Sequence, residues 1–427
     1  MAMFAALVSV AACTKETPDD TGTFGPNPTI GEPTAGGVPT LNNAKAVGWP
    51  AGAAPTPAAG LTVTRYAEGL AHPRWLYLLP NGDVLLAEAS SKPSTVNSPQ
   101  ALIANNMMRS GGAFSENANH ITLLRDSDGD GDVDVKTQYI GGLNQPQGMA
   151  LVGDSLYVAN TDALLRFPYV AGAESITAPG EKILDLPYRA EGNGHWTRTL
   201  LASADGAKLY IAVGSVSNIG DYGMDAEKDR AAIWEVDLAT KQKRIFASGL
   251  RNPVGIAWEP ASNTLWTAVN ERDLLGDDLT PDYMTSVKDG AFYGWPYSYW
   301  GKIVDTRVKP QDPALVATAL TPDYALGAHT ASLGLHFHAG PALGAFSNGA
   351  YIGQHGSWNR TQHAGYKVIF VPFADGRPNG LPQDVLTGFL NAKNEAQGRP
   401  VGVAQDRTGA LLVADDVGKI VWRVAAQ

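Results

Sequence analysis

Histidine 195 lies in a segment whose residue types suit acid–base chemistry. Residues 192–200 read GNGHWTRTL, and the two glycines match the start of a dinucleotide-binding fingerprint. Thr197 replaces the third glycine, and a strand–turn–strand pattern follows where that fingerprint requires a helix. The segment therefore predicts no nucleotide site. Neutral imidazole, with an ordinary pKa of about 6.5, makes His195 a candidate general base, and a packed core histidine beside Trp196 is the alternative.

Three further polar residues occupy comparable positions in other segments. Arg251 and Asn252 lie in GLRNPVG, and Arg399 lies in GRPVGV. A positive charge at such a position would stabilise an anion that forms during a reaction. Guanidinium groups also suit planar carboxylates, to which they donate paired hydrogen bonds. The alternative for Arg251 is an arginine that ties two loops to backbone carbonyls.

An acidic loop offers oxygen ligands for a metal. Asp126, Asp128 and Asp130, followed by Gly131, match the first half of a calcium-binding loop in DSDGDGDVD. Thr137 stands where the second half of such a loop has a bidentate glutamate, and alternating Asp and Gly are also typical of a solvated hairpin tip. The sequence predicts a structural Ca²⁺ site here, with the hairpin tip as the alternative.

Several histidines gather in one part of the sequence. With no cysteine nearby and no second clear pair, packing and loop hydrogen bonds are favoured over metal ligation. Two of them are two residues apart and would share one side of a strand. The histidines are His329, His336, His338, His355 and His363.

Strands must position these residues. The 47 glycines and 28 prolines, with only 17% charged residues, favour many short strands joined by turns. One pattern recurs six times: a Gly, often a Pro, an apolar stretch, a polar turn and a second apolar stretch. The copies are residues 69–88, 142–160, 192–215, 249–271, 334–356 and 398–416. This repeat predicts an all-β fold, a six-bladed β-propeller, with a β-sandwich as the alternative.

The ends of the repeat region predict how the ring closes. LTVTRYAE (61–68) can pair beside KIVWRVAAQ (419–427), which would remove the exposed sheet edges. In such a ring, the segments that lead into the inner strands open onto the central channel at one face. We therefore expect His195, Arg251, Asn252 and Arg399 to lie close together, although they are far apart in the sequence.

The N-terminal residues predict targeting rather than fold. An apolar run, FAALVSVAAC, ends at Cys13 and is followed by polar residues. This pattern predicts a lipoprotein signal over residues 1–13, lipidated at Cys13, and a bacterial periplasmic or cell-envelope location; an ordinary secretory peptide is the alternative. Residues 14–60, rich in Pro, Gly, Thr and Ala, predict a flexible linker before a propeller domain over residues 61–427.

Charge and motif content exclude several function classes. The net charge of −10, without a basic patch interleaved with aromatic residues, argues against nucleic-acid binding. Beyond the N-terminal run, no apolar stretch approaches the length of a membrane span, so membrane attachment is expected only through the lipid. No G-x-S-x-G, H-E-x-x-H or phosphate-binding loop occurs, which removes the commonest hydrolase and nucleotide-hydrolase templates.

Several motifs together resemble one family. They are GHWTRTLLASADGAKLYIAVG, ASGLRNPVGIAWEP, NERDLLGDDLTPDYM, DGAFYGWPYSYWG, GQHGSWNRTQHAGYKVIFVPF and GRPVGVAQDRTGALLVADDVGKIVWRV. In this order, over roughly residues 61–427, the chain resembles the sorbosone dehydrogenase family, relatives of the soluble pyrroloquinoline quinone (PQQ) dependent glucose and aldose dehydrogenases.

The resemblance implies an oxidoreductase that uses PQQ with Ca²⁺. Such an enzyme takes a hydride from an aldose sugar or aldehyde and passes electrons to a quinone or another acceptor. His195 corresponds to the family's general base, and Arg251 and Asn252 correspond to residues that contact the quinone and the reacting oxygen. In the relatives an acidic residue often precedes the histidine. Here Gly194 stands in that place, so the group that orients His195 is an open question.

The resemblance also implies partners for the cofactor carboxylates and for calcium. Arg360, Lys367 and Arg399 are candidates for the carboxylates. The Ca²⁺ of the relatives is bound largely by backbone carbonyls, which here correspond to Glu271, Arg272 and Tyr293. Asp277 and Asp278 would support that loop or cap the following turn.

Two other function classes remain open at this point. One is a non-enzymatic propeller whose channel face binds a glycan or a protein partner, because this fold carries many binding functions. The other is a lactonase-type propeller hydrolase, which would need several channel carboxylates that the inner-strand starts do not supply. The particular sugar depends on loop shape, which the sequence does not give.

Overall fold

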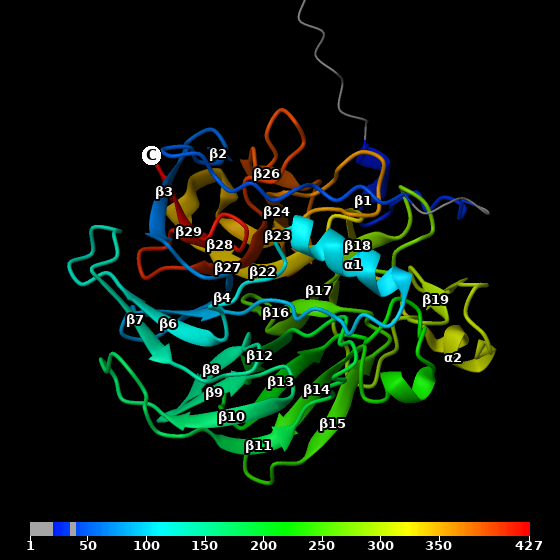
Figure 1. Ribbon diagram of the computed structural model, residues 1–427, viewed down its shortest axis with the longest axis horizontal. Coiled ribbons are helices and arrows are strands. Elements are labelled where there is room, and N and C mark those ends of the chain that lie inside the picture. Colours follow the sequence, from blue (N-terminus) through cyan, green and yellow to red (C-terminus); the bar gives the residue numbers. More distant parts are fainter. Residues whose placement is uncertain (1–19, 35–39) are drawn as a thin grey trace, which may run out of the picture.

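Six antiparallel sheets of at least four strands surround a common centre in chain order (Figure 1). The computed structural model describes residues 20–34 and 40–427. Successive sheets follow one another around the ring, and α1 (Pro99–Ser110) lies across the face turned to the viewer in Figure 1. The predicted six-bladed β-propeller is confirmed.

The first three blades each contain four strands in sequence order. Blade 1 consists of β4 (Pro73–Leu78), β5 (Val84–Glu88), β6 (His120–Arg125) and β7 (Val135–Ile140). Blade 2 consists of β8 (Met149–Val152), β9 (Ser155–Ala159), β10 (Ala163–Pro168) and β11 (Glu181–Asp185). Blade 3 consists of β12 (Arg198–Ala202), β13 (Lys208–Val213), β14 (Ala232–Asp237) and β15 (Lys243–Ser248).

The last three blades recruit strands from the N-terminal part of the chain. Blade 4 consists of β16 (Pro253–Glu259), β17 (Thr264–Val269), β18 (Pro281–Ser286), β21 (Tyr324–Ala328) and the added β1 (Phe24–Gly25). Blade 5 consists of β22 (Ser332–Ala339), β23 (Asn348–Gln354), β24 (Lys367–Ala374), β26 (Gln383–Thr387), the added β2 (Thr56–Pro57) and β25 (Arg377–Pro378), which pairs with β24. Blade 6 consists of β27 (Pro400–Gln405), β28 (Leu411–Asp415), β29 (Ile420–Ala426) and β3 (Leu61–Glu68).

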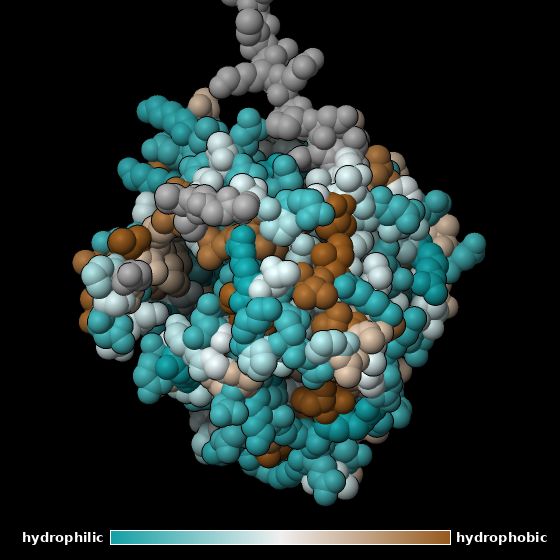
Figure 2. All heavy atoms as spheres, turned by 90° about the vertical axis from the view of Figure 1, so that its right-hand side faces the viewer, coloured by the Kyte–Doolittle hydropathy of each residue, from teal (hydrophilic) through white to brown (hydrophobic). Residues whose placement is uncertain are grey.

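An insertion between β18 and β21 of blade 4 lies on the side of the molecule that Figure 2 faces. It contains α2 (Pro313–Thr318) and the hairpin of β19 (Ser298–Tyr299) and β20 (Ile303–Val304). Three 3₁₀ helices cover Asp20–Thr23, Met224–Glu227 and Pro341–Phe346. The surface in Figure 2 is mainly hydrophilic and carries a band of apolar side chains. Over residues 20–34 and 40–427, no helix combines the length and apolar character needed to cross a bilayer.

The ring closes in the predicted way. β3 pairs antiparallel with β29, from Leu61 opposite Ala426 to Glu68 opposite Ile420. The N-terminal strand of the propeller therefore completes the C-terminal blade, which leaves blades 1 and 6 as ordinary neighbours instead of free edges. Each of the six sequence repeats forms the two innermost strands of one blade.

Glycines in the inner strands allow neighbouring blades to approach closely. A Cβ atom at Gly255 of β16 would lie 2.6 Å from the backbone nitrogen of Leu335 in β22. A Cβ atom at Gly402 of β27 would lie 2.6 Å from the carbonyl oxygen of Arg74 in β4. The glycine of each P-V-G motif is thus required where two inner strands touch near the axis.

The hydrophobic core is divided among the contacts between blades. Among the described residues, six buried clusters each lie mainly between two adjacent blades. Between blades 4 and 5, for example, Trp266 and Met284 share a cluster with Leu335 and Ile352. Since both faces of each blade are covered in this way, the inner strands are apolar on both sides, as the sequence runs suggested.

The linker predicted over residues 14–60 needs correction in its described part. β1 and β2 pair with the outer strands β21 and β26, and Ala44 is buried in the core between blades 5 and 6. Trp49 donates a hydrogen bond from Nε1 to Asp415 Oδ2 at 2.7 Å. These contacts use backbone groups and single side chains, so they leave no periodic pattern in the sequence. The predicted signal and Cys13 lie outside the described residues.

Candidate functional site

A pocket of about 490 Å³, here called the central pocket, opens where the inner strands begin. Its wall includes the segments that precede β12, β16 and β27, the segments that follow β13, β17 and β23, and one side of α1. His195, Arg251 and Arg399 all line it, as the ring geometry predicts. Asn252 does not line it.

Ser215 orients the imidazole of His195. The Nδ1 atom lies 2.9 Å from the Ser215 carbonyl oxygen and 3.0 Å from Ser215 Oγ. The carbonyl only accepts hydrogen bonds, and the Ser215 hydroxyl already donates to the Ser217 carbonyl at 2.7 Å. Nδ1 must therefore carry the proton and donate. The lone pair is then on Nε2, which forms no hydrogen bond within the described residues.

Gly194 is explained by this arrangement. A Cβ atom at this position would lie 2.6 Å from the carbonyl oxygen of Val216, so no larger residue fits without moving the backbone. The Ser215 carbonyl takes the orienting role that the resemblance gives to an acidic residue. Burial lowers the pKa of His195 to about 3, helped by the positive charge of Arg251. At neutral pH the imidazole is therefore a neutral proton acceptor.

Arg251 is fully engaged by the protein. Nε and Nη2 donate to the carbonyl oxygen and the Oδ1 atom of Asn218, at 3.2 and 2.9 Å. Nη1 donates to the carbonyls of Asn270 and Glu271, at 3.2 and 2.6 Å, and Nη2 also donates to Asp273 Oδ2 at 3.2 Å. All five N–H groups of the guanidinium have partners. The geometry thus favours the loop-tying alternative, in which Arg251 acts on the pocket through its charge.

An ion pair that sequence reasoning missed lies beside Arg251. His329 Nδ1 lies 3.3 Å from Asp273 Oδ1, and its Nε2 lies 2.8 Å from the carbonyl oxygen of Gly276. Both partners only accept hydrogen bonds, so both ring nitrogens carry protons. Burial lowers the pKa of His329, but the hydrogen bond and charge of Asp273 outweigh it and raise the pKa overall. The resemblance motif NERDLLGDD contains Asp273 but gives no sign of its partner, which follows β21, 56 residues further along the chain.

A third histidine of the central pocket, His355, contacts a buried aspartate. His355 Nε2 lies 2.9 Å from Asp416 Oδ2, which also accepts from Arg74 Nη1 at 2.5 Å. Asp416 is ionised at neutral pH, because burial raises its pKa but the hydrogen bond from His355 and the charge of Arg74 help to lower the pKa overall. Burial lowers the pKa of His355 to about 4, so this imidazole is neutral at pH 7. The sequence predicted loop hydrogen bonds for His355 but did not indicate that its partner is the buried carboxylate of Asp416.

Arg399 is a buried cation without a carboxylate partner among residues 20–34 and 40–427. Its Nη2 donates to Asn43 Oδ1 and to the Ala44 carbonyl, at 3.0 and 3.2 Å. Its Cζ lies 4.8 Å from the centre of the Tyr366 ring. The Nε atom is buried and has no hydrogen-bond partner. A buried positive charge of this kind is costly unless a bound anion neutralises it.

Two other predicted carboxylate partners lie elsewhere. Arg360 Nη2 pairs with Asp278 Oδ1 at 3.1 Å, and Lys367 Nζ pairs with Asp384 Oδ1 at 2.7 Å. Neither residue lines the central pocket, so the structure does not bring them together with Arg399. Trp358 of the segment between β23 and β24 does line the pocket, whereas Lys367 begins the third strand of its blade. Asn252 is buried, and its Oδ1 has no hydrogen-bond partner.

Two of the three carbonyls predicted to bind calcium already accept hydrogen bonds. The Glu271 carbonyl accepts from the Arg251 guanidinium, and the Arg272 carbonyl accepts from Thr280 Oγ1 at 3.2 Å. Calcium takes six to eight oxygen ligands, and a cation beside Arg251 would be repelled. The Glu271 carbonyl therefore does not fit the ion, and calcium binding by Arg272 and Tyr293 stays a prediction.

The acidic loop between β6 and β7 does bring its three carboxylates together. Ligand oxygens of Asp126, Asp128 and Asp130 lie within 4.8 Å of one another. Asp126 accepts hydrogen bonds from the amides of Gly129 and Gly131, at 2.6 and 3.1 Å. Such contacts are those of a hairpin tip, and calcium binding at this loop stays a prediction.

Two histidines of the remaining group form hydrogen bonds within the protein. His336 Nε2 lies 3.4 Å from Gln405 Oε1, and His338 Nε2 lies 2.9 Å from the Gly340 carbonyl. Neither lines the central pocket. The preference for packing and loop hydrogen bonds over metal ligation agrees with these contacts.

Comparison with known proteins gives one family and several relatives. The TrAA12-like family model matches residues 55–289 and 302–426. The chain is 28% identical to an uncharacterized protein of Borreliella burgdorferi over 293 residues, which are 66% of this chain and 76% of that protein. It is 29% identical to the pyrroloquinoline quinone-dependent pyranose dehydrogenase of Coprinopsis cinerea over 295 residues, which are 53% of this chain but only 39% of that protein.

Solved structures share the fold. The holo form of the pyranose dehydrogenase PQQ domain from Coprinopsis cinerea matches with a TM-score of 0.70 at 21% identity, covering 87% of this chain and 97% of that one. The calcium structure of Trichoderma reesei Carbohydrate-Active Enzymes Family AA12 matches with a TM-score of 0.70 at 19% identity, covering 91% and 99%. Because the family model matches most of the sequence, the chain belongs to the TrAA12-like family.

Proposed function

We propose that the protein is a PQQ-dependent dehydrogenase that oxidises an aldose sugar or an aldehyde such as sorbosone. Family membership and the curated pyranose dehydrogenase among its relatives support this activity. The single observation that carries the proposal is the buried, unpaired guanidinium of Arg399, in the same pocket as the neutral imidazole of His195.

The residues of the central pocket fit an anionic cofactor. PQQ carries three carboxylates, and Arg399 offers an uncompensated charge with a buried Nε that lacks a partner. The imidazolium of His329 and the guanidinium of Arg251 add positive charge, which Asp273 offsets only in part. Arg399 would hold a carboxylate, while His329 and Arg251 would favour the reduced, anionic form through their charge.

Oxidation removes a hydride from carbon and a proton from the attached hydroxyl. When bound, PQQ supplies the hydride acceptor. His195 Nε2 takes the hydroxyl proton, because its lone pair faces no protein donor and Ser215 fixes the ring through Nδ1. The imidazolium that results is stabilised by the negative charge of Asp273, which acts to raise the pKa of His195. A cyclic aldose leaves as a lactone, and an aldehyde, which would react as its hydrate, leaves as a carboxylic acid.

The proposal also includes calcium and a cell-envelope location, although no catalytic step depends on either. Calcium accompanies PQQ in the family resemblance, but the Glu271 carbonyl accepts from the cation of Arg251, so no step depends on the ion. We place the protein in the bacterial periplasm or cell envelope, anchored through Cys13, with a quinone or another acceptor receiving the electrons. Replacement of Cys13 by Ser should release it from the membrane fraction, and unchanged fractionation would remove the anchor.

Reconstitution tests the proposed function. The purified full chain is titrated with PQQ, with and without Ca²⁺, while tryptophan fluorescence is recorded. Aldoses and aldehydes are then screened with an artificial electron acceptor. We expect tight PQQ binding and turnover of at least one sugar or aldehyde. A chain that binds no PQQ under either condition would overturn the enzyme hypothesis and leave a propeller that binds a glycan or a protein partner.

A further inference from the structure

We propose that residues 40–47, here called the strap, are a working part of the central pocket and that Asn43 positions Arg399 for an anionic ligand. The strap precedes residue 55, where the match to the family model begins. It is therefore a feature of this chain that the family match does not supply. The identity of the anion as PQQ rests on the proposed function, whereas the positioning contact does not.

The strap ties together loops from different parts of the ring. The Asn42 amide donates to the Trp358 carbonyl at 2.9 Å, in the segment after β23. The Ala46 amide donates to the Ser110 carbonyl at the end of α1, at 2.8 Å. The Ala396 amide donates to the Lys45 carbonyl at 2.8 Å, in the segment that leads to β27. The strap thus forms hydrogen bonds with three separate segments around the central pocket.

Asn43 is the strap residue that lines the central pocket. Its Oδ1 accepts from Arg399 Nη2 at 3.0 Å, and its Nδ2 donates to the Met107 carbonyl in α1 at 2.8 Å. The Ala44 carbonyl accepts from the same Nη2 at 3.2 Å. Both hydrogens of Nη2 are therefore used by the strap.

These contacts fix the plane of the guanidinium. Tyr366 covers one side of Arg399, and the strap holds its Nη2 edge. A Cβ atom at Gly111 would lie 2.6 Å from Asn43 Nδ2, so the end of α1 packs directly against the asparagine. Asn43 consequently links the cation of the pocket to the helix that supplies its Met107 and Met108 wall.

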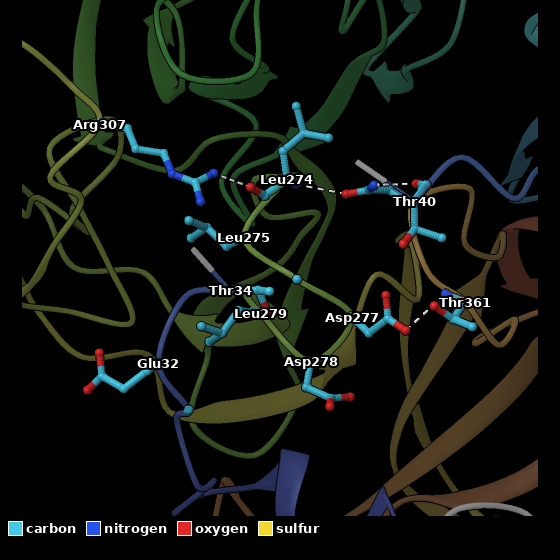
Figure 3. Close-up of a pocket in the computed structure, with 13 residues that line it drawn as sticks. Glu32, Thr34, Thr40, Leu274, Leu275, Asp277, Asp278, Leu279, Arg307 and Thr361 are labelled. Carbon is cyan, nitrogen blue, oxygen red and sulfur yellow. Dashed lines mark hydrogen bonds between the residues drawn. The ribbon is translucent and has the colours of Figure 1, made fainter. Parts of the chain in front are cut away.

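Thr40, at the start of the strap, lines a second pocket, here called the side pocket. Figure 3 shows its lining, in which Thr40 faces the loop that carries Leu274 and Asp277. Asn359 donates to the Thr40 carbonyl at 2.6 Å, and its Oδ1 accepts from the Leu274 amide at 2.8 Å. Leu274 lines both pockets. The strap is thus attached to the same loop that carries Asp273 into the central pocket.

Two substitutions of Asn43 test the inference in the full chain. Asn43→Ala removes the acceptor for Arg399, and Asn43→Asp places a carboxylate there that competes with a ligand for the guanidinium. We expect the dissociation constant for PQQ to rise about tenfold in Asn43→Ala and further in Asn43→Asp, because a charge-assisted hydrogen bond positions the cation. In Asn43→Ala the dissociation constant for PQQ should change by a larger factor than turnover at saturating PQQ, which separates positioning from the chemical step.

Asn348→Ala is the matched control. It removes an amide-to-carbonyl hydrogen bond of the same kind, from Asn348 Nδ2 to the Phe373 carbonyl at 2.9 Å, outside both pockets. Its PQQ affinity should equal that of the unsubstituted protein. Equal affinity in Asn43→Ala, Asn43→Asp and the control would overturn the role of Asn43.

A measurement without cofactor keeps the two proposals separate. Hydrogen exchange of the amides in residues 107–113 and 396–400 should be faster in Asn43→Ala than in Asn348→Ala, because the clamp between α1 and Arg399 is lost. Unchanged exchange in both segments would overturn the inference even if PQQ binds. Failure of the unsubstituted chain to bind PQQ, with faster exchange in Asn43→Ala, would overturn the proposed function and support the clamp.

Discussion

Two buried arginines of this protein should respond in opposite ways to the same substitution. Arg399 lacks a carboxylate partner among the described residues, whereas Arg74 pairs with Asp416 at 2.5 Å. Methionine has a similar length and carries no charge. Arg399→Met gives up two hydrogen bonds to Asn43 and Ala44, worth about 1 kcal/mol each, but removes an uncompensated buried charge that costs several kcal/mol.

The magnitudes follow from this difference. The unfolding free energy of cofactor-free Arg399→Met should be unchanged or higher, while its dissociation constant for PQQ rises about ten- to hundred-fold with loss of a charged hydrogen bond of about 1.5–3 kcal/mol. Arg74→Met leaves Asp416 as a buried charge without its main partner and should lower the unfolding free energy by about 3–5 kcal/mol.

Urea unfolding and PQQ titration by tryptophan fluorescence measure both effects on the same preparations. The slope of each unfolding curve shows whether the native state stays compact. If Arg399→Met loses as much stability as Arg74→Met, the charge of Arg399 is already balanced inside the protein. If Arg399→Met binds PQQ as tightly as the unsubstituted chain, Arg399 does not hold the cofactor.

Three further predictions concern His195, His329 and the glycine that precedes His195. His195→Gln should lower turnover about 10²- to 10⁴-fold with little change in PQQ affinity; steady-state kinetics and titration test this, and normal turnover would exclude His195 as the base. Because the pKa of His329 is raised in the folded protein, its protonation should stabilise the fold. This contribution to the unfolding free energy is complete below the pKa of the unfolded state, about 6.5, and is lost as the pH rises through the folded pKa. His329→Gln should therefore flatten that part of the curve of unfolding free energy against pH, and an unchanged curve contradicts the Asp273 ion pair. Gly194→Ala should reduce turnover because its Cβ would meet the Val216 carbonyl at 2.6 Å; activity equal to the unsubstituted protein would show that the His195 backbone has room to shift.

The repeat in the sequence was sufficient to predict the ring. Each repeat carries an inner hairpin, and hairpins are local, so six copies give six blades and a closing pair of strands. Because the start of every inner strand faces the axis, the repeat alone places three distant residues, His195, Arg251 and Arg399, in one pocket.

Side-chain partners from different blades could not be predicted in the same way. Asp416 follows β28, and its partners His355 and Arg74 belong to the two adjoining blades. Nothing in the local sequence of Asp416 specifies these neighbours. The opposite case is Lys367, which follows closely after His355 in sequence but lies on the third strand of its blade and pairs with Asp384.

Two neighbouring charges act in opposite directions on the base of the central pocket. Burial and the charge of Arg251 lower the pKa of His195 to about 3, where imidazole accepts a proton poorly. The charge of Asp273 acts to raise this pKa. Arg399, the cation that has no carboxylate partner among the described residues, is not among the main causes of the shift. The group that would hold an anion is therefore distinct from the groups that set the strength of the base.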